Sequence, residues 1–155
     1  MHVLRFTVDE TRYALPIERI VEVAPRVLVT PLPGAPSFVE GVFSFRQSPC
    51  IAISLRRRLG HPARRPALDE HILVVKGRRR LLGLIVDRAH DDATIDDTRI
   101  EPAHEHGSGG GGAASAVSGV IALADGVMLV QDVDAMLSDA EEHAVDASLE
   151  GATPG

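Results

Sequence analysis

The fold is decided by the stretch GVFSFRQSPCIAISLRRRL at residues 41–59, because residues 119–137 repeat its pattern without a gap. In both copies a glycine opens an apolar run, a polar break follows, and a second apolar run leads to a final leucine. A second pair of segments, residues 13–19 and 82–88, also matches. Repeated supersecondary units usually share buried surface. The chain is therefore predicted to be a duplicated small β unit.

The composition is that of one globular domain with an aliphatic core, since the 155 residues include only four Phe, one Tyr and no Trp. A formal net charge of −6 argues against nucleic acid as the main partner. The single cysteine, Cys50, excludes an internal disulfide and is expected to be buried in a strand. No apolar run approaches about 18 residues, and the N-terminus lacks a signal-peptide core. We therefore expect a cytoplasmic protein with no direct membrane insertion.

Short apolar runs between turn residues predict an all-β fold with short helices, in the form of two small barrels. Strands are expected at residues 3–8, 12–15, 20–23, 27–29, 38–45, 50–55, 71–75, 81–86, 93–95, 120–123 and 127–130, with helical turns at 16–20 and 56–59. Residues 30–36 contain three prolines, which remove ladder donors, and are expected to form a surface connector.

The repeat places one barrel at about residues 1–60 and the other at 70–138. Asp132 or Asp134 is expected to cap a helix that runs to about residue 143, with Met136 and Leu137 buried. Residues 139–155 would then hold the end of this helix and a tail. Residues 144–155 have little to bury and are predicted to be disordered.

Several polar groups could carry chemistry, and each has a plainer interpretation. A metal-responsive loop could use Glu101, His104, Glu105 and His106, and a small hydrolase could use Asp91, Asp92, Asp96 and Asp97. Solvated side chains are favoured in both cases, and the glycine run at 107–112 is expected to be a linker because it lacks a phosphate-loop ending. The arginines at 56–58, 64–65 and 78–80 are expected in solvated turns or in a patch for an acidic protein. No catalytic residue, metal site or cofactor is predicted.

Several short apolar and turn segments follow one another in a definite order between residues 4 and 137. They lie at residues 6–8, 13–17, 20–23, 30–36, 38–46, 54–56, 83–87 and 119–120. Their order and spacing resemble those of the CheW family, the coupling proteins of bacterial chemotaxis arrays. The central segment is similar to the family's Gly-Val-x-Asn-Leu-Arg-Gly motif, with Gly41 and Arg46 at matching positions.

This resemblance implies two interlocked five-stranded SH3-like barrels that share a core within residues 1–138. It also implies a non-enzymatic adaptor, without a cofactor, that bridges the cytoplasmic tip of a chemoreceptor to the regulatory domain of a CheA-like histidine kinase. Receptor-binding residues are expected at Ile20, Glu22, Gly41, Phe43, Phe45, Arg46 and Ile72. The apolar residues expected to face the kinase, each of which could instead be core, are Leu32, Phe38, Val120, Ile121, Leu123 and Met128.

The sequence departs from the family pattern at several positions. Ser44 replaces the motif's asparagine, Gln47 its last glycine, and Ser54 an aspartate at a strand end. Asp92 stands where couplers often have an apolar residue, and the family's proline is displaced to Pro49. The fold is expected to tolerate these changes. They leave open a divergent coupler of a non-motility signalling system.

Overall fold

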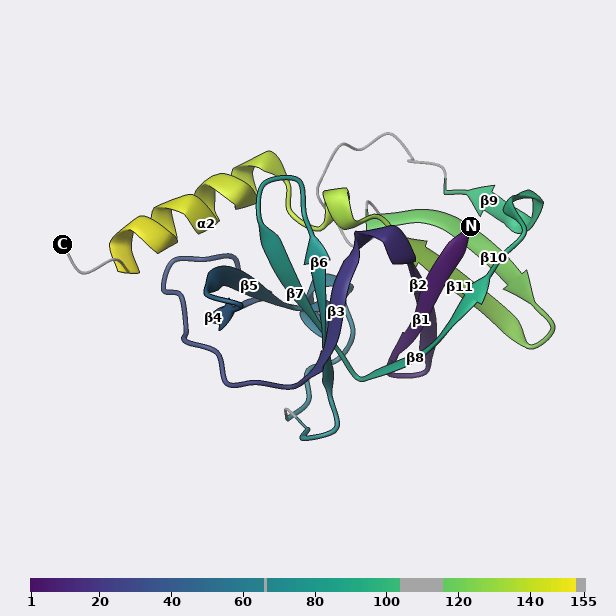
Figure 1. Cartoon of the computed structure of the whole chain (residues 1–155), viewed down its shortest axis with the longest axis horizontal. Helices are drawn as coiled ribbons and strands as arrows, with labels where there is room; N and C mark the ends of the chain where they lie inside the picture. Colours follow the sequence, from purple (N-terminus) through teal and green to yellow (C-terminus); the bar gives the residue numbers. More distant parts are fainter. Residues whose placement is uncertain (66, 104–115, 153–155) are drawn as a thin grey trace.

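The computed structural model describes residues 1–65, 67–103 and 116–152, which form two β-sheets side by side and a C-terminal helix (Figure 1). The six-stranded sheet has the order β8-β1-β2-β11-β10-β9, and the five-stranded sheet has the order β3-β6-β7-β5-β4. The strands of the first sheet are β1 (His2–Val8), β2 (Thr11–Pro16), β8 (Arg88–Thr94), β9 (Ile100–Pro102), β10 (Val117–Leu123) and β11 (Gly126–Gln131). Those of the second are β3 (Ile20–Pro25), β4 (Val39–Phe45), β5 (Ser48–Ser54), β6 (His71–Lys76) and β7 (Leu81–Val86).

The two sheets repeat one pairing scheme, as the sequence repeat predicts. The β4–β5 hairpin pairs in parallel with β7 through β5, and the β10–β11 hairpin pairs in parallel with β2 through β11. Strands β7 and β2 each belong to a second antiparallel hairpin, β6–β7 or β1–β2. The mostly β architecture with two SH3-like units is therefore confirmed.

The strands of each sheet do not follow the division into residues 1–60 and 70–138. The first sheet takes β1 and β2 from the start of the chain and β8 to β11 from its end, whereas the second takes β3 to β7. The chain crosses between the sheets through the 3₁₀ turn η1 (Ile17–Arg19) and again after β7. In each parallel pair, β5–β7 or β2–β11, one strand comes from the first half of the chain and the other from the second half. The two units therefore interlock.

The apolar side chains form three clusters, and the largest draws on both sheets. It holds residues of β1 and β2, such as Phe6 and Leu15, together with residues of β5, β6 and β7, such as Ile53, Leu73 and Leu84. Two smaller clusters belong mainly to one sheet each. The two units therefore share a core, and neither could bury its apolar surface alone.

Strand β5 shows how a central strand serves two clusters at once. Its residues Cys50 to Ser54 are all buried, because successive side chains point to opposite faces and both faces are covered. Ile51 and Ile53 enter the shared core, whereas Cys50 and Ala52 enter the cluster of the second sheet. Burial raises the pKa of the Cys50 thiol to about 12, so this cysteine is inert at neutral pH.

The C-terminal segment differs from the expectation. Met136 and Leu137 are buried, as predicted, whereas Asp132 caps only the short turn η4 (Val133–Ala135) and not the expected helix. The helix α2 (Asp139–Ala152) begins later and extends further, so the predicted disorder is wrong for residues 144–152. A capping box starts α2: the Ser138 Oγ accepts from the Glu141 amide, and the Glu141 carboxylate accepts from the Ser138 amide. Val145, fully buried, anchors it, and residues 153–155 lie outside the described chain.

Candidate functional site

The exposed arginine at the tip of the β4–β5 hairpin is held in a defined position. A two-residue turn joins these strands, and Arg46 and Gln47 have positive φ values of 49° and 69°. This backbone places the Arg46 guanidinium 4.8 Å from the centre of the Phe45 ring and 2.9 Å from the Glu22 carboxylate on β3. The contact joins the two edge strands of the five-stranded sheet, β3 and β4. The Arg46 side chain is nevertheless 65% exposed, so its remaining donors can reach a partner.

The turn predicts a stabilising substitution. Positive φ at both central positions is typical of a type I′ hairpin turn, which favours glycine at the second position. Gln47→Gly is therefore expected to raise the free energy of unfolding by roughly 1 kcal/mol. Denaturant titration measures this change, and Ser44→Gly, an exposed position within β4, serves as the control because glycine weakens a strand. Equal destabilisation by both changes would contradict the assignment of the turn.

The structure separates the residues expected to bind a receptor into exposed and buried groups. Glu22 and Arg46 are exposed, and Ile20 and Phe43 are partly buried. Ile72 is fully buried and Phe45 only 9% exposed, so the expectation that they line an open groove is wrong: both belong to the cluster of the second sheet. Gly41 contributes no side chain. The Phe43 ring packs where Gly83 has no side chain, since a Cβ there would lie 2.7 Å from it.

The residues expected to face the kinase separate in the same way. Leu32, Ile121 and Met128 are 6%, 0% and 2% exposed, so they are core residues and their prediction as a contact surface is wrong. Ile121 and Met128 face into the first sheet's cluster because neighbouring residues of a strand alternate between faces. Val120, Leu123 and Phe38 keep part of their surface exposed.

The acidic residues near β8 do not form a shared site. The Asp92 carboxylate contacts His2 Nε2 at 2.5 Å, Asp97 contacts the N-terminal amine at 2.7 Å, and Asp96 accepts from the Thr98 amide. These hydrogen bonds lower the pKa of Asp92 and of Asp96, so both are ionised at neutral pH and neither is suited to act as a general acid. Glu101 lies exposed on β9.

The metal alternative gains no support from the described chain. His104, Glu105, His106 and the glycine run at 107–112 lie outside the described residues. Within residues 1–65, 67–103 and 116–152, no group of three or more His, Cys, Asp or Glu side chains could hold a metal ion. No helix of the same residues is long and apolar enough to cross a membrane.

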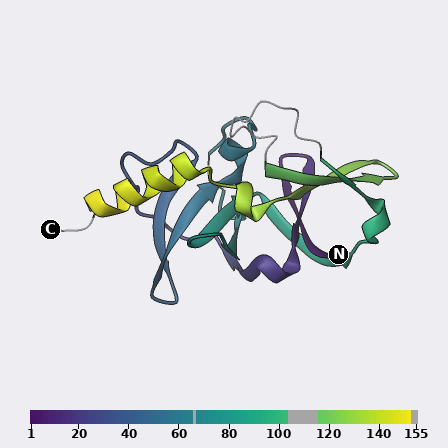
Figure 2. The same ribbon diagram turned by 90° about the horizontal axis from the view of Figure 1, so that it is seen from above.

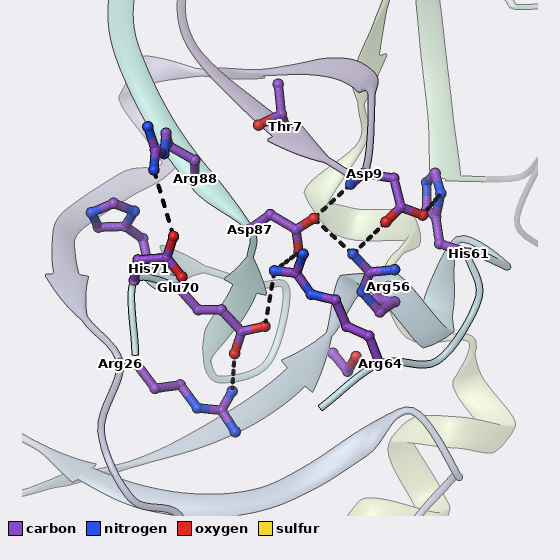
Figure 3. Close-up of polar contacts among 12 residues, drawn as sticks. Thr7, Asp9, Arg26, Arg56, His61, Arg64, Glu70, His71, Asp87 and Arg88 are labelled. Atoms are coloured by element: carbon purple, nitrogen blue, oxygen red, sulfur yellow. Dashed lines mark hydrogen bonds and ion pairs between the residues drawn. The ribbon is translucent and has the colours of Figure 1, made fainter. Parts of the chain in front are cut away.

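A largely buried network of ion pairs joins the two units, and sequence reasoning missed it (Figure 3). Arg56, from the helical turn α1 (Leu55–Arg58), contacts Asp9 in the β1–β2 turn at 2.5 Å and Asp87 at 2.7 Å. Asp87 lies where the chain crosses from β7 to β8. Arg64 reaches Asp87 at 3.1 Å and Glu70 at 3.7 Å, from the segment between α1 and β6. The network therefore links the β1–β2 turn of the first sheet to α1 and the α1–β6 segment of the second, at the point where the chain crosses from β7 to β8.

The burial of this network corrects the interpretation of the arginine runs. Arg56 and Arg58 are 8% and 5% exposed, not solvated, and Arg58 donates to the carbonyls of Ala135 and Met136. Arg56 lowers the pKa of Asp9 by a hydrogen bond, whereas burial raises the pKa of Glu70. A buried charge is stable only when it is paired, so the network is a structural element and not a free acidic or basic surface.

Comparisons with known proteins agree with this architecture. The CheW-like domain family matches residues 2–141. The chain is 33% identical to the chemotaxis protein CheW of Helicobacter pylori over 100 residues, which are 64% of this chain and 61% of that protein. It is 27% identical to the chemotaxis protein CheW of Rhizobium meliloti over 141 residues, 91% and 90% of the two chains. The crystal structure of the scaffolding protein TtCheW from Thermoanaerobacter tengcongensis superposes with a TM-score of 0.80 at 26% identity, covering 90% of this chain and 94% of that one.

Proposed function

The chain belongs to the CheW-like family of chemotaxis scaffold proteins, and from this we propose that it is a non-enzymatic cytoplasmic adaptor that couples the cytoplasmic tip of a chemoreceptor to the regulatory domain of a CheA-like histidine kinase. The similarity spans nearly the whole described fold, including both units and the connections between them. The observation that carries the proposal is the arginine of the family motif, Arg46, which the turn presents to solvent.

The receptor contact is proposed at the β3 and β4 edges of the second unit. Glu22 and Arg46 provide opposite charges there, and Ile20 and Phe43 provide partly exposed apolar surface. A helical hairpin that docks on such a surface would bury its apolar residues against Ile20 and Phe43 and use a few charges to set its register. The guanidinium fork can bind a carboxylate or the carbonyls at a helix end.

Arg46→Ala is expected to weaken binding of a purified receptor cytoplasmic fragment by about tenfold or more while leaving the melting temperature within a few degrees. The exposed ion pair with Glu22 contributes little to stability, but a contact buried on binding contributes more. Titration calorimetry with the receptor fragment measures the first effect, and thermal unfolding measures the second.

Arg99→Ala is the matched control, because Arg99 is exposed on the other unit and donates to the Ala122 carbonyl. It is expected to leave receptor binding unchanged. Equal losses in the two variants would point to overall charge and not to a site at the hairpin tip. Failure of the unsubstituted chain to bind either a receptor fragment or a kinase regulatory domain would overturn the adaptor proposal.

The kinase contact is proposed on those predicted kinase-facing residues that are partly exposed in the structure. Val120 of β10 lies on the same face of the β10–β11 hairpin as the exposed Val127, whereas Leu123 lies on the opposite face and packs against the first sheet's cluster. Arg12 and Asp125 form an ion pair at 2.8 Å next to that turn. An apolar centre with a charged rim is the usual anatomy of a protein interface. Phe38 lies on the other unit, at the start of β4, and belongs to a separate surface.

A further inference from the structure

The helix α2 carries a pattern of docking residues although it has little apolar surface. Its only large apolar side chains are Val145 and Leu149. Its inward-facing residues recur at helical spacings of three and four and comprise Glu142, Val145, Asp146 and Leu149. This spacing is the one by which an amphipathic helix anchors itself in a groove of another protein. Much of this pattern lies beyond residue 141, where the match to the CheW-like family ends.

The surface under α2 combines an apolar floor with a basic rim. Val145 and Leu149 pack in the cluster that includes Leu32, Ala35 and Phe38 of the connector between β3 and β4. The contact is close, since a Cβ on Gly34 would lie 3.3 Å from the Ser148 Oγ. Figures 1 and 2 show α2 running along the end of the molecule that holds β4 and β5.

The rim is the arginine triplet of the β6–β7 turn. Arg80 Nε donates to the Glu142 carboxylate at 2.9 Å, and a second nitrogen of Arg80 bonds Asp146. Arg79 reaches Asp146 at 3.1 Å, and Arg78 donates to the Leu137 carbonyl at 3.1 Å. Three cations thus face an acidic helix. Two large apolar residues and a set of charge pairs hold α2, so its attachment depends on salt more than that of the strands does.

We propose that α2 is an intramolecular ligand of this groove, and that the groove accepts an acidic amphipathic helix of a partner protein when α2 is displaced. The seated helix itself defines the chemistry of the partner: carboxylates spaced for the arginine triplet, with Val- or Leu-sized side chains between them. Leu32 and Phe38 belong to the apolar cluster in which Val145 and Leu149 pack, so displacement of α2 would expose part of that cluster. This inference does not depend on the identity of the receptor or the kinase.

Amide hydrogen exchange of the isotope-labelled full chain tests the proposal, with an unlabelled synthetic peptide of residues 138–152 as the probe. The α2 amides are expected to exchange at least about tenfold faster than those of β6 and β7, because α2 opens without global unfolding. Excess peptide at millimolar concentration should accelerate α2 exchange further, since it competes with a tethered helix of similar effective concentration. A peptide carrying Val145→Asp and Leu149→Asp should have no effect.

Arg80→Gln provides the second arm of the test in the full chain. It is expected to accelerate α2 exchange by about tenfold and to leave β1 and β2 protected, because it removes two charge pairs from the rim only. Arg88→Gln, which removes an exposed pair with Asp69, is the control and should change neither. Exchange of α2 at the same rate as the strands, with no response to the peptide in the unsubstituted chain, would overturn the proposal even if Arg80→Gln fails to fold.

Discussion

Replacing Gly41 by alanine is expected to lower the free energy of unfolding by roughly 3 kcal/mol or more. A Cβ at this position would lie 2.0 Å from the Thr30 carbonyl oxygen, a distance that no rotamer change can relieve because both groups belong to the backbone. The connector would have to move away from β4. It would lose the two hydrogen bonds between Thr30 and Val42, at 2.8 and 2.9 Å. Urea unfolding followed by circular dichroism measures the loss.

Gly60→Ala is the matched control for this prediction. Gly60 also has a positive φ, of 78°, but nothing lies within 4 Å of a Cβ placed there. Its replacement is expected to cost only about 1 kcal/mol, the penalty for the left-handed conformation alone. Losses of the same size at both positions would show that the contact with Thr30 is not what requires glycine. A receptor-binding defect in Gly41→Ala would reflect this structural effect and would not identify a binding residue.

The repeat in the sequence was sufficient to predict most of the strands and the shared core, because apolar alternation is typical of strands that bury a face. The strand expected at residues 27–29 is wrong, since these residues form no strand, and β9 was not predicted. The hairpins of β1–β2, β6–β7 and β10–β11 lie where turn residues interrupt such runs. Strand β8 was underestimated, since it spans Arg88–Thr94 and most of its side chains are exposed. It is an edge strand held by pairing with β1, and backbone pairing leaves no apolar pattern in the sequence.

The start and the length of helix α2 were predicted incorrectly for a different reason, since a helix was expected from Asp132 or Asp134 only to about residue 143. The capping box Ser138-x-x-Glu141 is visible in the sequence and could have marked its start. Its length depends on Arg79 and Arg80, which are more than 60 residues away in the chain and belong to the β6–β7 turn. A local pattern can mark the start of such a helix, but it cannot predict how far tertiary charge pairs extend it.

The sequence was sufficient to locate the motif of the candidate site, but not to predict which of the candidate residues are exposed. Arg46 and Glu22, which the resemblance to the CheW family predicts to bind a receptor, contact each other at the surface, but Ile72 and Met128 are core residues. An apolar residue in a strand has the same identity whether it faces the core or a partner, so the sequence cannot assign each residue to the inside or the outside. Two partners of Arg56, Asp87 and Asp9, are 31 and 47 residues away in the sequence. The crossing of the chain between the sheets brings them together.

Arg56→Ala is expected to destabilise the protein by roughly 3 kcal/mol, because it leaves the Asp87 carboxylate without its main partner in a nearly buried site. The side chains of Arg56 and Asp87 are 10% and 13% exposed. The estimate lies at the lower end for a broken buried pair, since Arg64 still reaches Asp87 at 3.1 Å. Arg57→Ala, one position along, is the control. Arg57 is exposed and its side chain donates to the Ser37 carbonyl, so a loss under about 1 kcal/mol is expected. Similar losses in the two variants would contradict the role of the network.

The same variant should change how stability depends on pH. The hydrogen bond from Arg56 lowers the pKa of Asp9 in the folded state below its unfolded value of about 3.9. The resulting stabilisation is fully present above about pH 5 and is lost as the pH falls through the lowered folded pKa. Arg56→Ala removes the largest cause of this shift, while His61 still contacts Asp9 at 3.2 Å. The stability of the variant should therefore fall less than that of the unsubstituted chain between about pH 5 and about 2. The raised pKa of Glu70 acts in the opposite direction, but Glu70 pairs with Arg26 and Arg64 in both proteins, so its effect largely cancels in the comparison. Parallel pH profiles would show that Asp9 does not depend on Arg56, and that the network does not hold the β1–β2 turn against the second unit.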